Sequence, residues 1–489
     1  MSILVVDVGT SGVRGAVVRP DATVEHIHHV AVLPDTPFPG LVEFDATAMA
    51  EAVLEVARRS LVDGGPVDAV GIANQRASTI VWDRATGVPV GPGLGWQDLR
   101  TVGTCLDLQA QGIRVAPNAS ATKVAALLDL ADPDRARSER GELAFGTVDT
   151  WVAWTLSGGR LHITDASNAG VTGLIHGDGS GWSLDLLAAL RIPESILPAI
   201  VDSTGAMGTA ELLDGRPVIA GMAGDQQASL IGQGCTRPGQ AKATFGTGGM
   251  LDQCVGPSRP PQAARGPAGP IPIIAWRRHG RVTWGIEAIM LSAGTCVEWL
   301  RDDLNIIDSA SQSADVAALC ETTGDVWFVP ALLGLGTPVW DFGARGTFTG
   351  LTRGSGRPEL VRAVLEGVAH RGADLLEAAE SDSGLPIGSL RIDGGMSANP
   401  VFTQALANAC GRPIEIAPVL EATTLGAAYL AGMAVGTWAD EEDVAAAWSP
   451  RLVVHPTITT DEHRSARVRW LDTRARAEGT IPELSALDF

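Results

Sequence analysis

The feature that most constrains the fold of this chain is a strand–turn–strand pattern that occurs twice. The first copy runs from the apolar stretch Ile3–Val6 through a glycine and hydroxyl turn, and it resumes at Val13–Val18. The second copy runs from Ala241–Phe245 through Gly246–Gly249 and resumes at Met250. This repeated pattern predicts two halves of the same architecture, each with a glycine-threonine turn.

Both turns are suited to binding phosphate. A hairpin turn with small hydroxyl residues points several donors at one place, as Thr10 and Ser11 would in the first turn. Two such turns facing each other would hold the phosphates of a nucleotide from both sides. A dinucleotide-binding loop does not fit, since it runs from a strand into a helix with Gly-x-Gly-x-x-Gly spacing. Asp7 could hold a magnesium ion through water, although an ordinary hairpin with a capping aspartate explains the same residues.

Asp225 is the candidate for the chemistry, within the sequence Met-Ala-Gly-Asp-Gln-Gln-Ala-Ser of residues 222–229. It follows the apolar run Val218–Ala220, which predicts a buried strand that Gly221 and Gly224 would end. A carboxylate held at a strand end beside amide side chains suits a general base that meets a hydroxyl group. Taken alone, the stretch favours a turn-capping aspartate, and the two glycine-threonine turns reverse that preference.

A polar cluster at residues 74–79 follows another predicted strand, Val67–Ala73. In an open α/β sheet, ligands bind at the carboxyl ends of the strands. Arg76 is therefore a candidate for contacting a substrate oxygen, and an ion-paired surface arginine is an equally good interpretation. Trp96 could form the wall of a small pocket, or pack in the core as single tryptophans more often do. His162 has no partner at metal-ligand spacing, which favours a structural role.

Other segments carry regular patterns. Helical spacing of apolar residues predicts one helix over Asp45–Val62, with Asp45 as its N-cap, and a second over Ile286–Leu300. An alanine-rich helix is expected at Ala422–Met433. Leu390–Asp393 predicts a buried strand that enters a double glycine, where a flat ring could lie close to the backbone.

Composition limits the classes of function. The chain has 489 residues, of which 45% are hydrophobic, and its formal net charge is −20. So acidic a chain is not expected to bind nucleic acid, which requires a basic surface. No stretch approaches the roughly 20 apolar residues of a membrane-spanning helix, and the first residues lack a signal-peptide pattern. The six cysteines are scattered, as expected for reduced thiols of a cytoplasmic protein.

Together these stretches resemble the FGGY family of carbohydrate kinases, and within it the glycerol kinases. The resemblance extends from Ile3 to about Trp438, with the motifs in the order and spacing of the family. The matching motifs are Asn74-Gln75-Arg76, Trp96-Gln97-Asp98, Gly146–Trp151, Thr164–Ala169, Gly224–Ala228, Phe245–Gly248, Trp340–Asp341, Gly350–Gly354 and Asp393–Met396.

The resemblance implies an α/β fold of two actin-like ATPase (ribonuclease H-like) domains with an active-site cleft between them. The expected division is 1–236 for the N-terminal domain, 237–440 for the C-terminal domain and 441–489 for a tail. A small polyol or sugar would bind mainly to the first domain and ATP mainly to the second. The implied reaction transfers the γ-phosphate of ATP to a hydroxyl of that polyol or sugar. The family also suggests a homodimer or homotetramer.

The resemblance further implies roles for individual residues. Asp225 would be the general base, and Asp7 and Asp225 would lie near a Mg2+ ion. The substrate positions would be Arg76, Ala77, Trp96, Asn118, Asp225, Gln226 and Met250. The nucleotide positions would be Thr10, Ser11, Gly12 and Arg14 in the first turn, Thr247 and Gly248 in the second, and Gly294, Glu298, Gly395 and Asn399 further along the chain.

Three substrate positions depart from glycerol kinases. Those enzymes carry a glutamate where this chain has Ala77, a tyrosine where it has Asn118 and a phenylalanine where it has Met250. Losing a carboxylate and a phenol leaves room and removes hydrogen bonds to glycerol. The departures favour a larger or different polyol, such as a tetritol, pentitol or ketose, with a glycerol kinase of altered pocket as the alternative. A silent ATP-binding sensor is a third interpretation, against which the retention of Asp7 and Asp225 argues.

Overall fold

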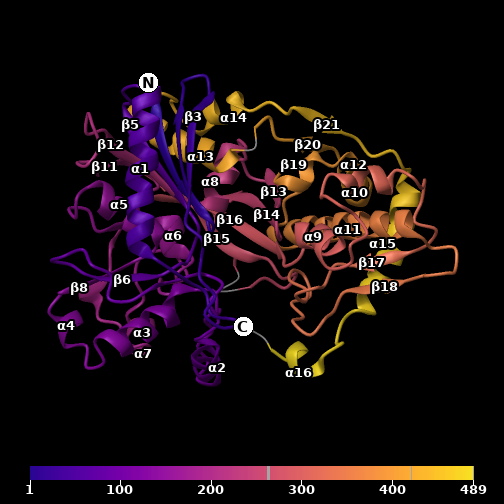
Figure 1. The fold of residues 1–489 in the computed structure, drawn as a ribbon, viewed down its shortest axis with the longest axis horizontal. Helices are drawn as coiled ribbons and strands as arrows, with labels where there is room; N and C mark the ends of the chain where they lie inside the picture. Colours follow the sequence, from indigo (N-terminus) through magenta and orange to yellow (C-terminus); the bar gives the residue numbers. More distant parts are fainter. Residues whose placement is uncertain (262–264, 420, 488–489) are drawn as a thin grey trace.

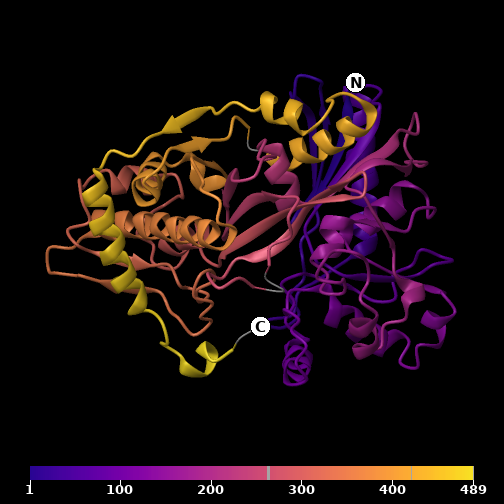
Figure 2. The ribbon, with the colours of Figure 1, turned by 180° about the vertical axis from the view of Figure 1, so that it is seen from behind.

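The computed structural model describes residues 1–261, 265–419 and 421–487, and it shows two halves that are each built on a β-sheet (Figure 1). The N-terminal half, in indigo and magenta, lies beside the C-terminal half, in orange and yellow, and the view from behind shows the same division (Figure 2).

The sheet of the N-terminal half has six strands in the order β11-β12-β5-β1-β2-β3. Strands β1, β2 and β3 form an antiparallel meander, while β1, β5 and β12 run parallel to one another. Strand β11 lies antiparallel to β12 at the edge. The bounds are β1 Ile3–Val8, β2 Gly12–Val18, β3 Val24–Ala31, β5 Ala69–Asn74, β11 Thr204–Thr209 and β12 Val218–Gly224.

The sheet of the C-terminal half has seven strands in the order β15-β16-β14-β13-β19-β20-β21. Here β13 and β14 form the hairpin, β16 and β15 extend it, and β13, β19 and β20 run parallel. The bounds are β13 Ala241–Phe245, β14 Gly249–Gly256, β15 Ile271–Arg278, β16 Arg281–Met290, β19 Leu390–Asp393, β20 Ile414–Ile416 and β21 Leu452–Val454.

Six strands of each sheet share one spatial arrangement, and β15 at the edge of the C-terminal sheet has no counterpart among the described residues of the N-terminal half. The hairpins β1-β2 and β13-β14 correspond, and each is followed by an antiparallel third strand, β3 or β16. On the other side, β5 and β12 correspond to β19 and β20, and an antiparallel edge strand, β11 or β21, completes the set. The prediction of two halves with the same architecture is therefore confirmed. Strand β21 comes from the residues that were expected to form a separate tail.

Two helices cover the N-terminal sheet, one on each face. Helix α1 (Ala46–Gly64) packs against one face, and its predicted N-cap is confirmed because Asp45 Oδ1 accepts hydrogen bonds from the N–H groups of Thr47 and Ala48. The other face is covered by α13 (Ala422–Val435), which comes from the C-terminal half of the sequence.

Two secondary-structure predictions were wrong. Gly221 does not end β12, which continues to Gly224. The missing side chain at Gly221 instead lets α13 approach, because a Cβ there would stand 2.4 Å from the backbone nitrogen of Ala431. The helix predicted over Ile286–Leu300 begins only at Gly294, since the preceding residues belong to β16, which pairs with strands on both sides.

The remaining elements surround this frame. The other helices are α2 Val102–Ala110, α3 Ser120–Ala131, α4 Ala136–Glu139, α5 Val148–Leu156, α6 Ala166–Gly170, α7 Leu184–Ala189, α8 Asp225–Gly232, α9 Gly294–Asp302, α10 Gln312–Ala317, α11 Arg357–Ser383, α12 Pro400–Cys410, α14 Glu441–Ala447, α15 Thr460–Ala475 and α16 Pro482–Ser485. The other strands are β4 Glu43–Phe44, β6 Ile80–Asp83, β7 Gly93–Leu94, β8 Leu143–Gly146, β9 Ile163–Asp165, β10 Ala199–Val201, β17 Trp327–Val329 and β18 Thr347–Thr349.

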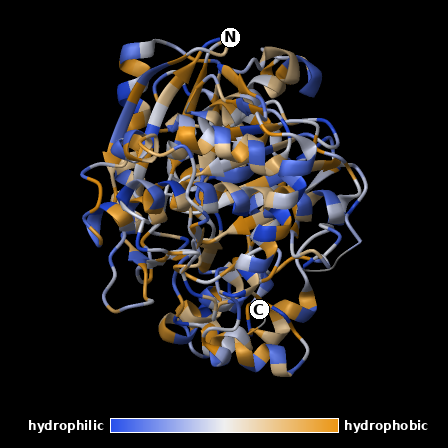
Figure 3. Cartoon of the chain, turned by 90° about the vertical axis from the view of Figure 1, so that its right-hand side faces the viewer, coloured by the Kyte–Doolittle hydropathy of each residue, from blue (hydrophilic) through white to orange (hydrophobic). Residues whose placement is uncertain are grey.

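Apolar residues gather on the strands and inward helix faces, and hydrophilic residues on the outer helices and loops (Figure 3). All six cysteines are free thiols, as predicted, and Cys320 alone among them is partly exposed. Among helices formed by the described residues, none combines the length and the apolar character that a membrane span requires. His162 has the structural role expected, because its Nε2 lies 2.8 Å from the carbonyl oxygen of Phe145.

Candidate active site

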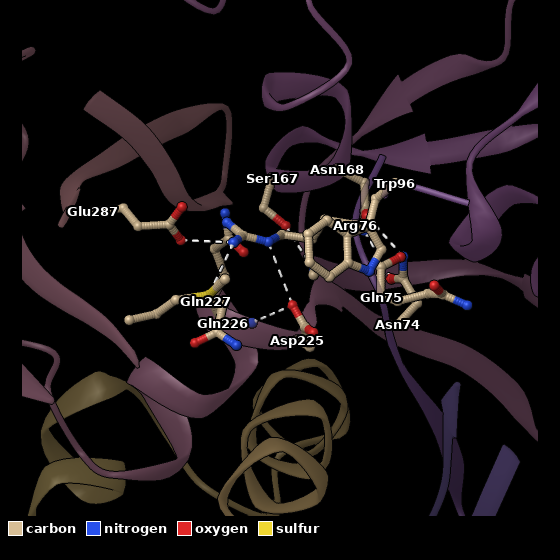
Figure 4. Close-up of polar contacts among 12 residues, drawn as sticks. Asn74, Gln75, Arg76, Trp96, Ser167, Asn168, Asp225, Gln226, Gln227 and Glu287 are labelled. Carbon is tan, nitrogen blue, oxygen red and sulfur yellow. Dashed lines mark hydrogen bonds and ion pairs between the residues drawn. The ribbon is translucent and has the colours of Figure 1, made fainter. Parts of the chain in front are cut away.

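Asp225 is the first residue of α8, where β12 ends and the chain turns into the helix. Its Oδ1 accepts a hydrogen bond from the N–H of Gln226 at 2.8 Å and lies 3.4 Å from Nε of Arg76 (Figure 4). Within the described residues, Oδ2 has no hydrogen-bond partner. Burial raises the pKa of Asp225, and the Arg76 guanidinium opposes that rise. This carboxylate therefore has one free oxygen and a higher proton affinity than an exposed aspartate.

Arg76 follows β5 in the N-terminal half and reaches residues of the C-terminal half. Its Nη2 lies 2.7 Å from Oε2 of Glu287 and 3.9 Å from the sulfur of Met250. The guanidinium thus stands between Asp225 on one side and Glu287 on the other (Figure 4). Its side chain is only 13% exposed, so these contacts fix its position.

Glu287 is a site residue that the sequence analysis missed. It lies on β16 in the segment predicted to be helical, and nothing in the sequence links it to Arg76, 211 positions earlier. Its buried carboxylate belongs to a charged row, because Lys242, Asp252 and Glu287 stand directly opposite one another on β13, β14 and β16. Burial raises the pKa of Glu287; Arg76 opposes this rise, and the Asp252 carboxylate adds to it.

Lys242 ties this charged row to the residue beside the candidate base. Its ammonium lies 2.8 Å from Oδ2 of Asp252, and both side chains are fully buried. It also donates hydrogen bonds to Oε1 of Gln226 and to the hydroxyl of Thr244. The C-terminal sheet therefore holds both Arg76 and Gln226, two predicted substrate residues, through buried charges.

Trp96 and Asn118 lie on two loops that one buried lysine holds together. The indole nitrogen of Trp96 donates to the hydroxyl of Thr10 at 3.3 Å, which places the tryptophan against the first turn. Lys123 donates to the carbonyl oxygens of both Trp96 and Asn118 at 3.0 Å. Burial lowers the pKa of Lys123 to about 8.

The three positions that depart from glycerol kinases lie around Arg76 and Trp96. Ala77 is buried directly after Arg76, and its carbonyl accepts a hydrogen bond from Ser120 at 3.0 Å. Met250 contacts the guanidinium of Arg76, and Asn118 is exposed on the loop next to Trp96.

Helix α6 supports the strand ends that carry the site. The hydroxyl of Ser167 accepts a hydrogen bond from the N–H of Gly224 at 3.0 Å, directly before the candidate base. Asn168 and Asn74 exchange two side-chain hydrogen bonds, of 2.8 and 3.0 Å (Figure 4). The Asp165 side chain caps α6 by accepting hydrogen bonds from the backbone N–H groups of Ser167 and Asn168. These residues explain the polar segment around Thr164–Ala169, whose role the sequence did not reveal.

The first turn carries Asp7 at its base. Burial raises the pKa of Asp7 to about 7; Arg14 opposes the rise, and the Asp225 carboxylate adds to it. Arg14 stands directly opposite Asp7 on β2, and the turn closes with a 2.9 Å hydrogen bond from Gly9 to Gly12. Thr10, Ser11 and Gly12 therefore lie beside two carboxylates and one arginine.

The second turn lies against the start of α9. Its Gly246 and Thr247 carbonyls accept hydrogen bonds from the backbone N–H groups of Gly294 and Ala293 at 2.8 and 2.9 Å. A side chain at Gly248 would meet the carbonyl oxygen of Met290 at 2.8 Å. The predicted nucleotide residues Thr247, Gly248 and Gly294 thus form one group, with Glu298 exposed one turn further along α9.

Gly395 and Asn399 follow β19. Gly395 is exposed, and a side chain there would meet open space. Asn399 caps α12 by accepting from Val401 and Phe402, and its Nδ2 donates to Ser313 at 3.0 Å. The side chain of Asn399 is therefore occupied by structural hydrogen bonds, and its adenosine role stays a prediction.

Comparison with known proteins identifies the family to which this two-half fold belongs. Residues 2–232 match the N-terminal domain, and residues 241–435 the C-terminal domain, of the FGGY family of carbohydrate kinases. The glycerol kinase of Trichlorobacter lovleyi is 41% identical, over 98% of this chain and 99% of that protein. The glycerol kinase of Dechloromonas aromatica is 40% identical, over 96% of each chain. The structure of Plasmodium falciparum glycerol kinase with ADP superimposes with a TM-score of 0.90 at 27% identity, over 97% of this chain and 98% of that one.

The chain belongs to the FGGY family of carbohydrate kinases. Its two halves are the two actin-like ATPase domains of that fold. It is an ATP-dependent phosphotransferase that acts on a hydroxyl of a sugar or polyol.

Proposed function

We propose that Asp225 is the general base of this kinase and that the acceptor is a small polyol larger than glycerol. The observation that carries the first part is the free Oδ2 of Asp225, on a carboxylate whose other oxygen is held by Gln226 and faces Arg76. The proton of the acceptor hydroxyl moves to Oδ2 as the hydroxyl oxygen bonds to the γ-phosphorus, and the bond to ADP breaks. Such a base contributes about 10²–10⁴-fold to the rate.

Arg76, Trp96 and Gln226 would bind and orient the acceptor. The transition state of phosphoryl transfer is loose, so positioning and charge neutralisation dominate catalysis. The contacts of Arg76 with Glu287 and Asp225 restrain its guanidinium before the acceptor arrives. A side chain that is already restrained loses less conformational entropy when the acceptor binds.

A Mg2+ ion would fit Asp7 and Asp225. Asp7 makes no side-chain hydrogen bond within the described residues, so its oxygens are free to face an ion or its water. The described residues contain no group of three or more His, Cys, Asp or Glu side chains that could hold a metal. Magnesium in kinases commonly uses one or two carboxylates and completes its shell with phosphate oxygens and water. When bound, it neutralises charge on the phosphate groups.

The size of the acceptor follows from Ala77, Asn118 and Met250. Two of them replace hydrogen-bonding groups of glycerol kinases, and Ala77 offers only a methyl group next to Arg76. A site without those groups loses kcal/mol amounts of binding to glycerol and gains space. Glycerol itself is the second candidate, because the relatives that are about 40% identical over the whole length are glycerol kinases.

The test is a coupled ADP-release assay with Mg-ATP against glycerol, tetritols, pentitols and ketoses. We expect a larger kcat/KM for one of the longer compounds than for glycerol. If glycerol exceeds every other compound, the size argument fails and the three substitutions are tolerated by a glycerol kinase. Asp225→Asn should lower kcat about 10²–10⁴-fold and leave ATP binding intact, and near wild-type turnover in that variant would remove Asp225 as the base.

A further inference from the structure

A second basic side chain accompanies Arg14 at the first turn. Arg14 on β2 stands directly opposite His29 on β3, and Asp7 on β1 stands opposite Arg14 on the other side. Because residues directly opposite one another project from the same face of a sheet, Asp7, Arg14 and His29 form one row across three strands. This face is the one that bears Asp7, whose carboxylate interacts electrostatically with that of Asp225.

The imidazole of His29 extends along β3 from this row toward the turn. A Cβ built on Gly12 would stand 2.4 Å from Nε2 of His29 and 3.0 Å from its Cε1. The Nε2 end of the ring therefore occupies the place where a side chain at Gly12 would begin. Gly12 itself lies opposite Ala31, and the N–H of Val32 binds the carbonyl of Ser11, so the end of β3 is fastened to the turn.

His29 differs from His26 and His28 on the same strand in having no partner among the described residues. His28 lies 2.8 Å from Asp63, and His26 lies 3.6 Å from Glu25. His29 is exposed and makes no hydrogen bond or ion pair within the described residues, and the guanidinium of Arg14 likewise makes none. Arg14 also faces the Asp7 carboxylate across the hairpin. In a chain of net charge −20, two basic groups side by side at a hydroxyl turn, neither of them in a hydrogen bond or close ion pair among the described residues, are an anion-binding arrangement.

We infer that His29 is a phosphate-binding residue that donates from Nε2 to the nucleotide bound at the first turn. The inference rests on the proposed role of Thr10 and Ser11 in holding the phosphates of ATP. Glycine at position 12 leaves the turn without a third side chain, and the imidazole supplies the missing donor from the neighbouring strand. An imidazole N–H and a phosphate oxygen form the kind of charge-assisted hydrogen bond that is shorter and stronger than a neutral one.

The experiment measures kcat, KM for ATP, KM for the acceptor, and binding of ADP and adenosine in His29→Ala, His29→Gln and His28→Ala. His28 is the matched control, because it is the next residue on the same strand and faces α1 instead. We expect His29→Ala to raise KM for ATP and weaken ADP about tenfold, with adenosine binding and KM for the acceptor unchanged. His29→Gln, which keeps an N–H donor, should recover part of the loss, and His28→Ala should match wild type.

Several outcomes would overturn the inference. KM for ATP within twofold of wild type in His29→Ala means that no phosphate contact exists. An equal loss of adenosine binding means that the imidazole only packs on Gly12. A higher KM for the acceptor, with KM for ATP and ADP binding unaffected, would assign the contact to the acceptor instead. If the wild-type protein binds no ADP and uses no ATP, the proposed function fails before His29 is tested.

Discussion

The hairpins of the two halves have the same frame, but they place their charges at different depths. In the first, Asp7, Arg14 and His29 form the second row from the turn, and none of their side chains makes a hydrogen bond or close ion pair within the described residues. In the second, the corresponding row holds Thr244, Met250 and Ile289. Its charges, Lys242, Asp252 and Glu287, lie one pleat deeper, and the first two are completely buried.

The difference separates two uses of charge. Under the proposed function, the charges near the first turn would bind a ligand, whereas the charges one pleat deeper in the second half are paired with one another and hold the predicted substrate residues. The buried row positions Arg76 and Gln226, which belong to the other half of the sequence. If the proposed function is correct, one duplicated frame supplies a binding surface on one side of the site and a support for it on the other.

The difference between the two charged rows should have its largest effect on the stability of the protein. Lys242→Met leaves the buried Asp252 charge without its partner, and breaking a buried ion pair in this way costs about 3–5 kcal/mol. Arg14→Met, at the unpaired position, should change the free energy of unfolding by about 0.5 kcal/mol or less. Urea denaturation of both variants measures the contrast, and equal destabilisation would show that the two rows do not differ in this way.

For kcat we expect the opposite: substitution at the first turn should have a large effect, and substitution at the equivalent place in the second half should have a small one. Asp7→Asn removes a carboxylate from the expected magnesium position, and we expect kcat to fall about 10²-fold. Thr244 occupies the equivalent place in the second half, and Thr244→Val should leave kcat close to wild type because its hydroxyl contacts Lys242. Steady-state kinetics at saturating Mg-ATP measure kcat for both variants. A loss of turnover in Thr244→Val as large as that in Asp7→Asn would contradict the assignment of the catalytic charges to the first turn.

The supporting role of the buried row is tested at Glu287. Glu287→Gln keeps the shape but removes the charge that holds Arg76, and KM for the acceptor should rise about tenfold while KM for ATP stays the same. The matched control is Asp202→Asn, since Asp202 lies 2.6 Å from Arg277 and also joins the two halves, at a place away from Arg76. If both variants change KM for the acceptor alike, Glu287 acts only by holding the halves together.

The buried lysine of the N-terminal half should make the stability of the protein depend on pH. Lys123 lies against two carbonyls, and burial lowers its pKa from 10.5 to about 8. Between these values the unfolded chain binds more protons than the folded one, so stability relative to Lys123→Met should rise as the pH increases from about 8 to about 10.5. Thermal unfolding across this range reports the trend, and a constant difference between the two proteins would argue against it.

The sequence was informative where a local pattern carries the function. The repeated turns, the strand before Asp225 and the cap of α1 all depend on residues close together in the chain, and the structure places them as predicted. Glu287 and the edge strand β21 escaped prediction because each gains its role from a strand pairing or an ion pair with distant residues. The alternation of β16 was also obscured, because the face that carries Glu287 also carries the apolar Ile289, while Trp284, Ile286, Ala288 and Met290 fill the other face.

The packing of α13 on the N-terminal sheet has a consequence for how the protein is made. Gly71 and Gly221 receive this helix so closely that an added Cβ at either would lie 2.4 Å from its backbone, and Thr204 donates to the carbonyl of Leu430 at 2.6 Å. The first half leaves the ribosome long before residues 422–435 are synthesised, and until then one face of its sheet lacks this covering helix. A nascent chain arrested at residue 400 should therefore expose this face to chaperones, while an arrest beyond residue 470 should not.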